Sequence, residues 1–169
     1  MFGGRKLLVV GVAECLVTED PEAILVTYAL GSCVAVVAHD PVVPVGGLLH
    51  LMLPQCSLDP RKAKQNPFMF ADSGVPLLLN KIYRKGADPG RLVVRIAGGA
   101  RIFDNSRLFN IGERNCAAVR NVLRYQGISI RDESVGGTDS RSVSLELGSG
   151  QYRIKAAGVS GPNLLGRSR

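Results

Sequence analysis

Apolar residues in the first third of the chain occur in short, mostly continuous runs and do not alternate with polar residues. Residues 6–12, 14–18 and 24–28 each predict a strand, as do two runs at 34–38 and 46–53 that are rich in valine and leucine. Continuous apolar strands are typical of strands that are covered on both faces. The pattern therefore predicts packed sheets or layers.

The runs at 34–38 and 46–53 are joined by a short segment with two prolines, which predicts a β-hairpin. A loop centred on residues 41–42 places Cys33 across from His50 or its neighbour. Directly opposed residues have Cβ atoms about 4.5–5.5 Å apart, so a thiol and an imidazole can meet here. A shift of one residue would instead place the two side chains on opposite faces.

Thr27 lies near the end of the run at 24–28, and the turn at 30–32 brings that run back beside Cys33. A hydroxyl near the imidazole of His50 can fix the ring, which is the third role in a nucleophile, base and orienter set. A purely structural interpretation is also open, since cysteine often packs as a small hydrophobe and buried histidine often only fills a core. Spacing alone favours that structural interpretation, because cysteine–histidine signatures do not transfer between families.

Two stretches later in the chain, residues 70–85 and 110–126, have the apolar spacing of amphipathic helices. Asp72 or Ser73 is the predicted cap of the portion that contains Pro76, because proline is tolerated in a first helical turn. Further strands are predicted by apolar runs at 91–97, 128–131, 142–147 and 152–156.

The composition is that of a soluble globular protein, with 46% hydrophobic and 21% charged residues in 169. We expect one domain over residues 1–157 and a mobile tail over 158–169, which is rich in Gly, Ser and Arg. No apolar run reaches the roughly 18–20 residues that span a bilayer, and the first twelve residues do not resemble a signal peptide. These features predict a cytoplasmic protein without membrane insertion.

The net charge of +7 predicts attraction to acidic surfaces, which can belong to nucleic acid or to an acidic protein. No basic stripe interleaved with aromatic residues is present, so nucleic-acid binding is disfavoured. The four cysteines form no Cys-x-x-Cys pair and there are only two histidines, so we expect no metal site.

Two further segments are candidates for substrate contacts. Arg61 and Lys62 belong to the densest basic cluster, in a polar segment that directly follows the strand of His50. Such a cluster is either a solvated loop or a surface that attracts an acidic partner. Gly98 and Gly99 break a predicted strand and allow close approach of another backbone, although a glycine pair is more often only a turn.

Five motifs in order along residues 7–156 resemble the CheD family: LGSCVAVV, GGLLHLMLP, AGGARIF, IGERN and VGG followed by Arg141. The resemblance implies Cys33 as nucleophile, His50 as base and Thr27 as orienting hydroxyl. The oxyanion donors expected beside them are the N–H of Cys33 and one from Gly31 or Ser32, because Gly31 permits an unusual backbone conformation.

The resemblance also implies an activity and a fold. It implies deamidation of glutamines in chemoreceptor cytoplasmic helices through a thioester, without a cofactor, and a CheC-type phosphatase as partner. The alternatives left open are a receptor methylesterase and a non-catalytic adaptor that binds receptors or CheC. The implied fold is α+β, a layered α/β/β/α sandwich with mixed sheets and outer helices, similar to the catalytic domain of cytotoxic necrotizing factor.

Overall fold

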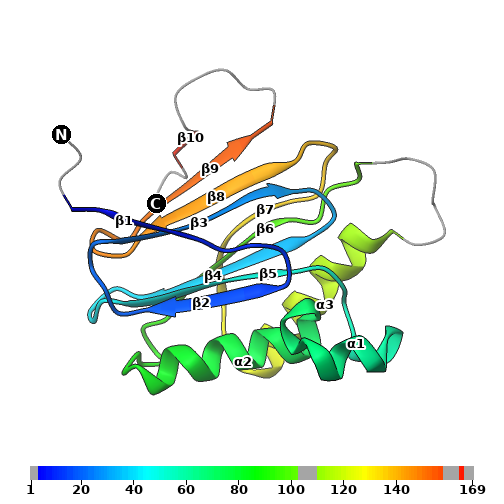
Figure 1. Cartoon of the computed structure of the whole chain (residues 1–169), viewed down its shortest axis with the longest axis horizontal. Helices are drawn as coiled ribbons and strands as arrows, with labels where there is room; N and C mark the ends of the chain where they lie inside the picture. Colours follow the sequence, from blue (N-terminus) through cyan, green and yellow to red (C-terminus); the bar gives the residue numbers. More distant parts are fainter. Residues whose placement is uncertain (1–3, 103–109, 158–163, 166–169) are drawn as a thin grey trace.

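The computed structural model describes residues 4–102, 110–157 and 164–165, and these form two packed β-sheets with helices on one side (Figure 1). The first sheet has the strand order β1 (Lys6–Val9), β3 (Ala23–Leu30), β8 (Arg141–Glu146), β9 (Gln151–Ala156) and β10 (Leu164–Leu165). The second sheet has the order β2 (Glu14–Thr18), β5 (Val45–Leu51), β4 (Val34–Asp40), β6 (Val93–Gly98) and β7 (Ile130–Val135).

Both sheets are mixed, which confirms the predicted α+β class. The pairs β1–β3 and β6–β7 are parallel, and the other neighbouring strands are antiparallel. A continuous antiparallel ladder joins β4 to β5, as the hairpin prediction required.

Strand β4 is buried along its whole length because it lies between two cores. Ala35 and Val37 point toward the first sheet and pack with Leu25 and Leu145 there. Side chains of the opposite parity, such as Val36, pack against the helices. Alternate residues of a strand face opposite sides, so an apolar residue is needed at every position. The prediction of burial on both faces is therefore confirmed for β4.

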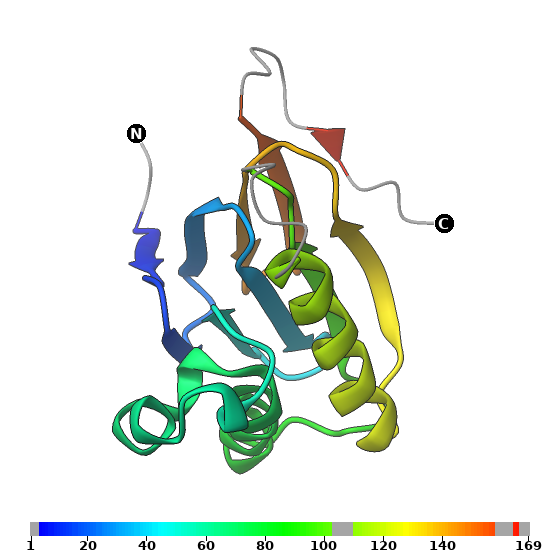
Figure 2. The same ribbon diagram turned by 90° about the vertical axis from the view of Figure 1, so that its right-hand side faces the viewer.

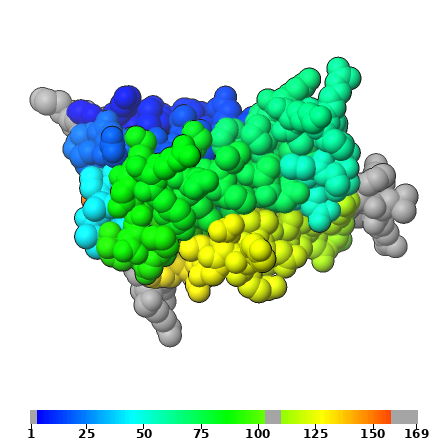
Figure 3. All heavy atoms as spheres, turned by 90° about the horizontal axis from the view of Figure 1, so that it is seen from below, coloured from blue at the N-terminus to red at the C-terminus, as the bar shows by residue number. Residues whose placement is uncertain are grey.

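The described residues form three α-helices: α1 (Pro60–Gln65), α2 (Ala71–Arg84) and α3 (Ile111–Tyr125). Helices α2 and α3 pack on the outer face of the second sheet, whereas α1 has no buried residue and contacts the short turns on either side of it. Short 3-10 turns flank α1 at Cys56–Leu58 and Pro67–Met69. All three helices lie on the same side of the sheets in Figure 1, and Figure 2 shows α3 beside β7. Seen from that side, α2 and α3 run next to one another over the surface (Figure 3).

The expected α/β/β/α layering is not met in the part of the chain that the structure describes. Its helices cover only the second sheet, so the layers are β/β/α (Figure 1). On the uncovered face of the first sheet, Leu7 and Val9 of β1 are more than half exposed. An apolar run therefore did not imply burial on both faces in this strand.

The capping of α2 also differs from the prediction. The helix begins at Ala71 without a side-chain cap and continues through Pro76, which lies beyond its first turn. Asp72 accepts hydrogen bonds from the backbone N–H of Cys56, and the Ser73 hydroxyl donates to a backbone carbonyl, so both side chains hold the preceding segment. Burial of one apolar face offsets the hydrogen bond that the proline cannot make.

The predicted boundary after residue 157 stays a prediction. Within the tail, the structure describes Leu164 and Leu165, whose backbone pairs with β9 as strand β10. The expected mobility of the tail concerns residues 158–163 and 166–169, which lie outside the described residues.

Candidate active site

Cys33 and His50 share the face of the second sheet that is turned toward the first sheet. In the β4–β5 ladder His50 is the direct partner of Ala35, and Cys33 lies two residues before Ala35. Continuing the ladder places Cys33 across from Met52, so Cys33 and His50 are diagonal neighbours, whose separation is typically roughly 7–8 Å between backbones. Cys33 is half-buried and packs against the core between the sheets, whereas His50 is 1% exposed.

The predicted direct opposition of Cys33 and His50 is therefore wrong in its register, although the shared face is as expected. The hairpin loop consists of the four residues 41–44 between paired Asp40 and Val45. The centre of the loop lies between residues 42 and 43, not at 41–42, so the residue opposite Cys33 is two positions later than predicted, Met52 in place of His50. A difference of two residues leaves His50 on the same face as Cys33.

Thr27 reaches His50 from the opposite sheet. Its hydroxyl Oγ1 donates to the carbonyl of Val10 at 2.6 Å and lies 2.8 Å from His50 Nδ1. A hydroxyl has one proton, so the contact with His50 requires Nδ1–H to donate and Oγ1 to accept. This tautomer leaves a lone pair on Nε2, which is buried and has no hydrogen-bond partner among the described residues.

A bulge in β3 follows Thr27 directly. The pairing of β3 with β8 shifts register between Thr27 and Leu30, and Ala29 has a left-handed φ of 56°. Bulges bend a strand and re-aim its side chains, often beside functional sites. The unusual backbone expected at Gly31 therefore lies at Ala29. Gly31 itself has no left-handed φ, and an added Cβ there would lie 3.0 Å from the side chain of Ile102.

The backbone around Cys33 is held by the end of β6. Gly99 N–H donates to the Cys33 carbonyl at 2.8 Å, and Ala100 N–H donates to the Gly31 carbonyl at 2.8 Å. Gly98 has φ 112°, and a Cβ there would clash severely with the Cys33 carbonyl oxygen. The glycine pair therefore permits close backbone approach, as predicted, while its contact with substrate stays a prediction.

Burial sets the protonation of the thiol and the imidazole. It raises the pKa of Cys33 above the ordinary value of 9.0, although the residue's own backbone N–H acts in the opposite direction. Burial also lowers the pKa of His50 below 6.5, while the negative charge of Glu14 partly counteracts this effect. Both groups are therefore neutral near pH 7.

Three polar residues near the site were not predicted to act there. Glu14 is the direct partner of His50 on β2. Asn115 on α3 donates through Nδ2 to the carbonyls of Ser32, at 3.0 Å, and Met52, at 2.8 Å. Arg141 donates to the carbonyl of Gly98 at 3.0 Å. Asn115 and Arg141 belong to two of the motifs that resemble the CheD family, IGERN and VGG followed by Arg141, and Asn115 also occupies the apolar spacing of its helix. By its chemistry Asn115 was a possible site residue, but it was expected to fix the start of the helix.

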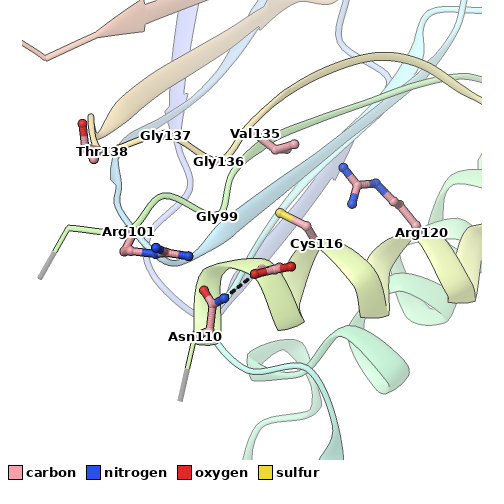
Figure 4. A pocket seen from close by; sticks show the side chains of 10 residues that line it. Gly99, Arg101, Asn110, Cys116, Arg120, Val135, Gly136, Gly137 and Thr138 are labelled. Carbon is pink, nitrogen blue, oxygen red and sulfur yellow. Dashed lines mark hydrogen bonds between the residues drawn. The ribbon is translucent and has the colours of Figure 1, made fainter. Parts of the chain in front are cut away.

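A cavity of about 370 Å³ lies between the N-terminal half of α3 and the loop after β7 (Figure 4). Gly99, Arg101 and Glu113 contribute to its wall, together with Cys116, which belongs to the core on the helix side. Neither Cys33 nor His50 lines it. The cavity and the thiol therefore lie on opposite faces of the second sheet.

The basic candidates Arg61 and Lys62 lie on α1, at the same end of the molecule as the junction after β5 (Figure 1). Both are exposed, and Lys62 Nζ lies 3.7 Å from a carboxylate oxygen of Asp59.

Within the described ranges, no group of three His, Cys, Asp or Glu residues is placed to hold a metal ion. No described helix is long and apolar enough to cross a membrane.

A thiol, an imidazole with an open nitrogen and an orienting hydroxyl are the kinds of group that cysteine-dependent hydrolases use. Comparison with known proteins identifies the family. Residues 52–156 match the family model described as CheD, chemotactic sensory transduction. The chain belongs to the CheD family.

Similar proteins include three bacterial relatives that are named as probable chemoreceptor glutamine deamidases. The relative from Solibacter usitatus is 46% identical over 89% of this chain and 89% of its own length. One from Anaeromyxobacter dehalogenans is 44% identical over 89% of this chain and 95% of its own. One from Syntrophus aciditrophicus is 44% identical over 89% and 94%, respectively.

Proposed function

We propose that this chain is a cysteine-dependent deamidase that converts glutamines of chemoreceptors to glutamate and releases ammonia. The observation that carries the proposal is the bond between Thr27 and His50, which leaves Nε2 open on the face that also holds Cys33. The names of the relatives identify the substrate class, a chemoreceptor glutamine.

In the first half-reaction, His50 Nε2 takes the proton of the Cys33 thiol while sulfur attacks the amide carbon of the substrate glutamine. The neutral resting pair means that the thiolate forms during attack. The imidazolium then protonates the amide nitrogen, the carbon–nitrogen bond breaks and ammonia leaves. The product of this half-reaction is a thioester on Cys33, with His50 neutral again.

In the second half-reaction, water attacks the thioester carbon and gives a proton to His50 Nε2. The carbon–sulfur bond then breaks, and the imidazolium returns the proton to the departing sulfur. Glutamate is released and the resting thiol is restored. Throughout both steps, the Thr27 oxygen accepts from Nδ1–H and so stabilises the imidazolium.

Each tetrahedral intermediate carries an oxyanion that needs hydrogen-bond donors. The backbone N–H of Cys33 is one donor in this scheme, and the N–H of Ser32 or Gly31 is the second. Because the carbonyl of Gly31 is bound by Ala100, the Ser32 N–H of the same peptide points away from β6. This orientation favours Ser32 over Gly31 as the second donor.

The substrate segment in this proposal is a cytoplasmic receptor helix that approaches the end of the sandwich near Cys33. Arg61 and Lys62 attract acidic groups of that helix, while Gly98 and Gly99 shape the floor of the site. A CheC-type phosphatase is proposed as a partner that competes for the same end. The proposed likeness to the catalytic domain of cytotoxic necrotizing factor is limited to the two packed mixed sheets, because the described helices cover only one of them (Figure 1).

The test is mass spectrometry of receptor cytoplasmic fragments incubated with the protein, with ammonia and methanol measured in parallel. A gain of about 1 Da at specific glutamines with equimolar ammonia is expected, because an amide nitrogen is replaced by oxygen. Cys33→Ala should abolish this conversion. Cys56→Ala is the matched control, since Cys56 is also half-buried but its thiol contacts Ser73 of α2.

Three results would contradict the proposal. Methanol release from methylated fragments without ammonia would indicate an esterase. Unchanged conversion by Cys33→Ala would remove the nucleophile assignment. Receptor binding without any conversion, equal in the wild type and Cys33→Ala, would indicate an adaptor.

A further inference from the structure

Asn115 is an amide in a helix face that is otherwise apolar or small. The buried positions of α3 are Gly112, Asn115, Cys116, Val119 and Leu123, which follow helical spacing. Asn115 is 0% exposed. Burying an amide opposes folding unless the amide is hydrogen-bonded. Asn115 is therefore expected to bind polar groups that an apolar side chain could not hydrogen-bond.

Both partners of Asn115 belong to the two strand ends that carry the site. Its Nδ2 donates to the carbonyl of Ser32, the residue before Cys33, at 3.0 Å. It also donates to the carbonyl of Met52, two residues after His50, at 2.8 Å. The β4–β5 ladder ends before both of these carbonyls, so a single side chain continues the cross-link between strands where backbone pairing stops.

The bond to Ser32 fixes more than one oxygen. Ser32 C=O and Cys33 N–H belong to the same planar trans peptide, so they point in opposite directions. With the carbonyl held toward α3, the N–H is directed away from the helix. That N–H belongs to Cys33 itself, so covalent geometry keeps it beside the nucleophilic sulfur. No other described residue accepts a hydrogen bond from it.

We propose that Asn115 is a positioning residue that aims the Cys33 backbone N–H at the oxyanion and holds it in register with His50. The inference rests on the proposed deamidation. Asn115 touches neither thiol nor imidazole, and its effect passes through the peptide before Cys33 and the carbonyl of Met52. The carbonyls of Gly31 and Cys33 accept from Ala100 and Gly99, which directly follow β6, so Asn115 completes the restraint of the turn.

The test compares Asn115→Leu and Asn115→Asp with Val119→Ala, measured well below the unfolding temperature of each variant. Leucine removes both donors, and aspartate keeps the volume while presenting a carboxylate to two carbonyls. Val119 is also fully buried in α3, but it lies one turn farther from the site. Val119→Ala therefore reports the cost of a weakened helix alone.

For Asn115→Leu and Asn115→Asp, kcat should fall about 10²–10³-fold, the size of losing one oxyanion donor, with little change in KM. Alkylation of Cys33 by iodoacetamide, followed on its peptide by mass spectrometry, should change by less than about threefold, because this displacement forms no oxyanion. Val119→Ala should lower the unfolding temperature and keep kcat.

Four results would overturn the positioning role. They are an unchanged kcat in a folded Asn115 variant, an equal loss of kcat in Val119→Ala, loss of alkylation together with kcat, and failure of both Asn115 variants to fold. If the wild type releases no ammonia from receptor fragments, the proposed function fails first. An active wild type with fully active Asn115 variants would overturn only this inference.

Discussion

The two histidines of this chain are buried at the same sheet interface, and the difference between them distinguishes chemistry from packing. His39 and His50 face the same side, at opposite ends of the β4–β5 ladder. They are 5% and 1% exposed. Each has one fully buried ring nitrogen without a hydrogen-bond partner among the described residues, Nδ1 in His39 and Nε2 in His50. Burial and an open nitrogen are therefore not sufficient to identify a base.

Their neighbours differ in kind. Burial has the largest effect on the pKa of His39, and the positive charge of Arg95 has the second largest. Together they lower this pKa to about 4, although the negative charge of Asp40 acts in the opposite direction. Arg95 lies over the ring of Tyr152 and donates to Asp132, so that end is a packed cationic cluster. His50 instead has a hydroxyl on Nδ1 and a thiol on its face, and Glu14 opposes the lowering of its pKa.

The largest expected effect comes from exchanging each imidazole for an amide. His50→Gln should reduce ammonia release by about 10²–10⁴-fold, the contribution of a general base. His39→Gln should leave the rate within about threefold, because no reacting group is within reach of that ring. Ammonia release from receptor fragments by both variants measures the contrast. Equal losses would mean that both histidines matter only through stability.

The next effect concerns the hydroxyl that distinguishes the two rings. Thr27→Val keeps the shape of the side chain but leaves Nδ1–H of His50 and the carbonyl of Val10 unpaired. We expect kcat to fall roughly tenfold to hundredfold, as for groups that orient metal-ligating histidines. Thr27→Ser keeps the hydroxyl and should retain most of kcat. A Thr27→Ser variant as impaired as Thr27→Val would indicate that the methyl packing matters instead.

Much of this site could be predicted because it rests on local patterns. The runs that form β3, β4 and β5 are evident in the sequence, and so is the turn that brings Thr27 near Cys33. The shared face of Cys33 and His50 could be predicted from the position of the hairpin loop. The observed pairing differs from the predicted one by two residues, and an even difference leaves both side chains on the same face. The contact between Thr27 and His50 was anticipated from the same turn.

The remaining parts depend on contacts far apart in sequence. Asn115 is separated from Ser32 by 83 positions, and only the packing of α3 against the second sheet brings them together. The bulge at Ala29 depends on pairing with β8, near the other end of the chain. Continuation of α2 through Pro76 depends on its buried face, which overrides local propensity.

A smaller effect, the pH dependence of the rate, distinguishes a neutral thiol–imidazole pair from a preformed thiolate–imidazolium pair. Because burial raises the pKa of Cys33 and lowers that of His50, kcat/KM should rise with pH as His50 loses its proton, at a pKa below 6.5. Alkylation of Cys33 by iodoacetamide should keep increasing beyond pH 9.0. A plateau of alkylation already at neutral pH would show a stable thiolate and contradict the resting state proposed here.

The smallest effect belongs to His39 and concerns stability. Its folded pKa of about 4 lies below its ordinary value of 6.5, so the unfolded chain takes up the proton first as pH falls. The stability due to neutral His39 is fully present above pH 6.5 and is lost by pH 4, a change of about 3 kcal/mol. Urea unfolding of the wild type and His39→Gln across this range measures it. The variant should lose less stability on acidification than the wild type. Because His50 and several carboxylates also titrate in both proteins, the contribution of His39 is the difference between their two curves of unfolding free energy against pH. Parallel curves would mean that His39 is solvated enough to keep an ordinary pKa, and the contrast between the two ends of the interface would then rest on the hydroxyl and the thiol alone.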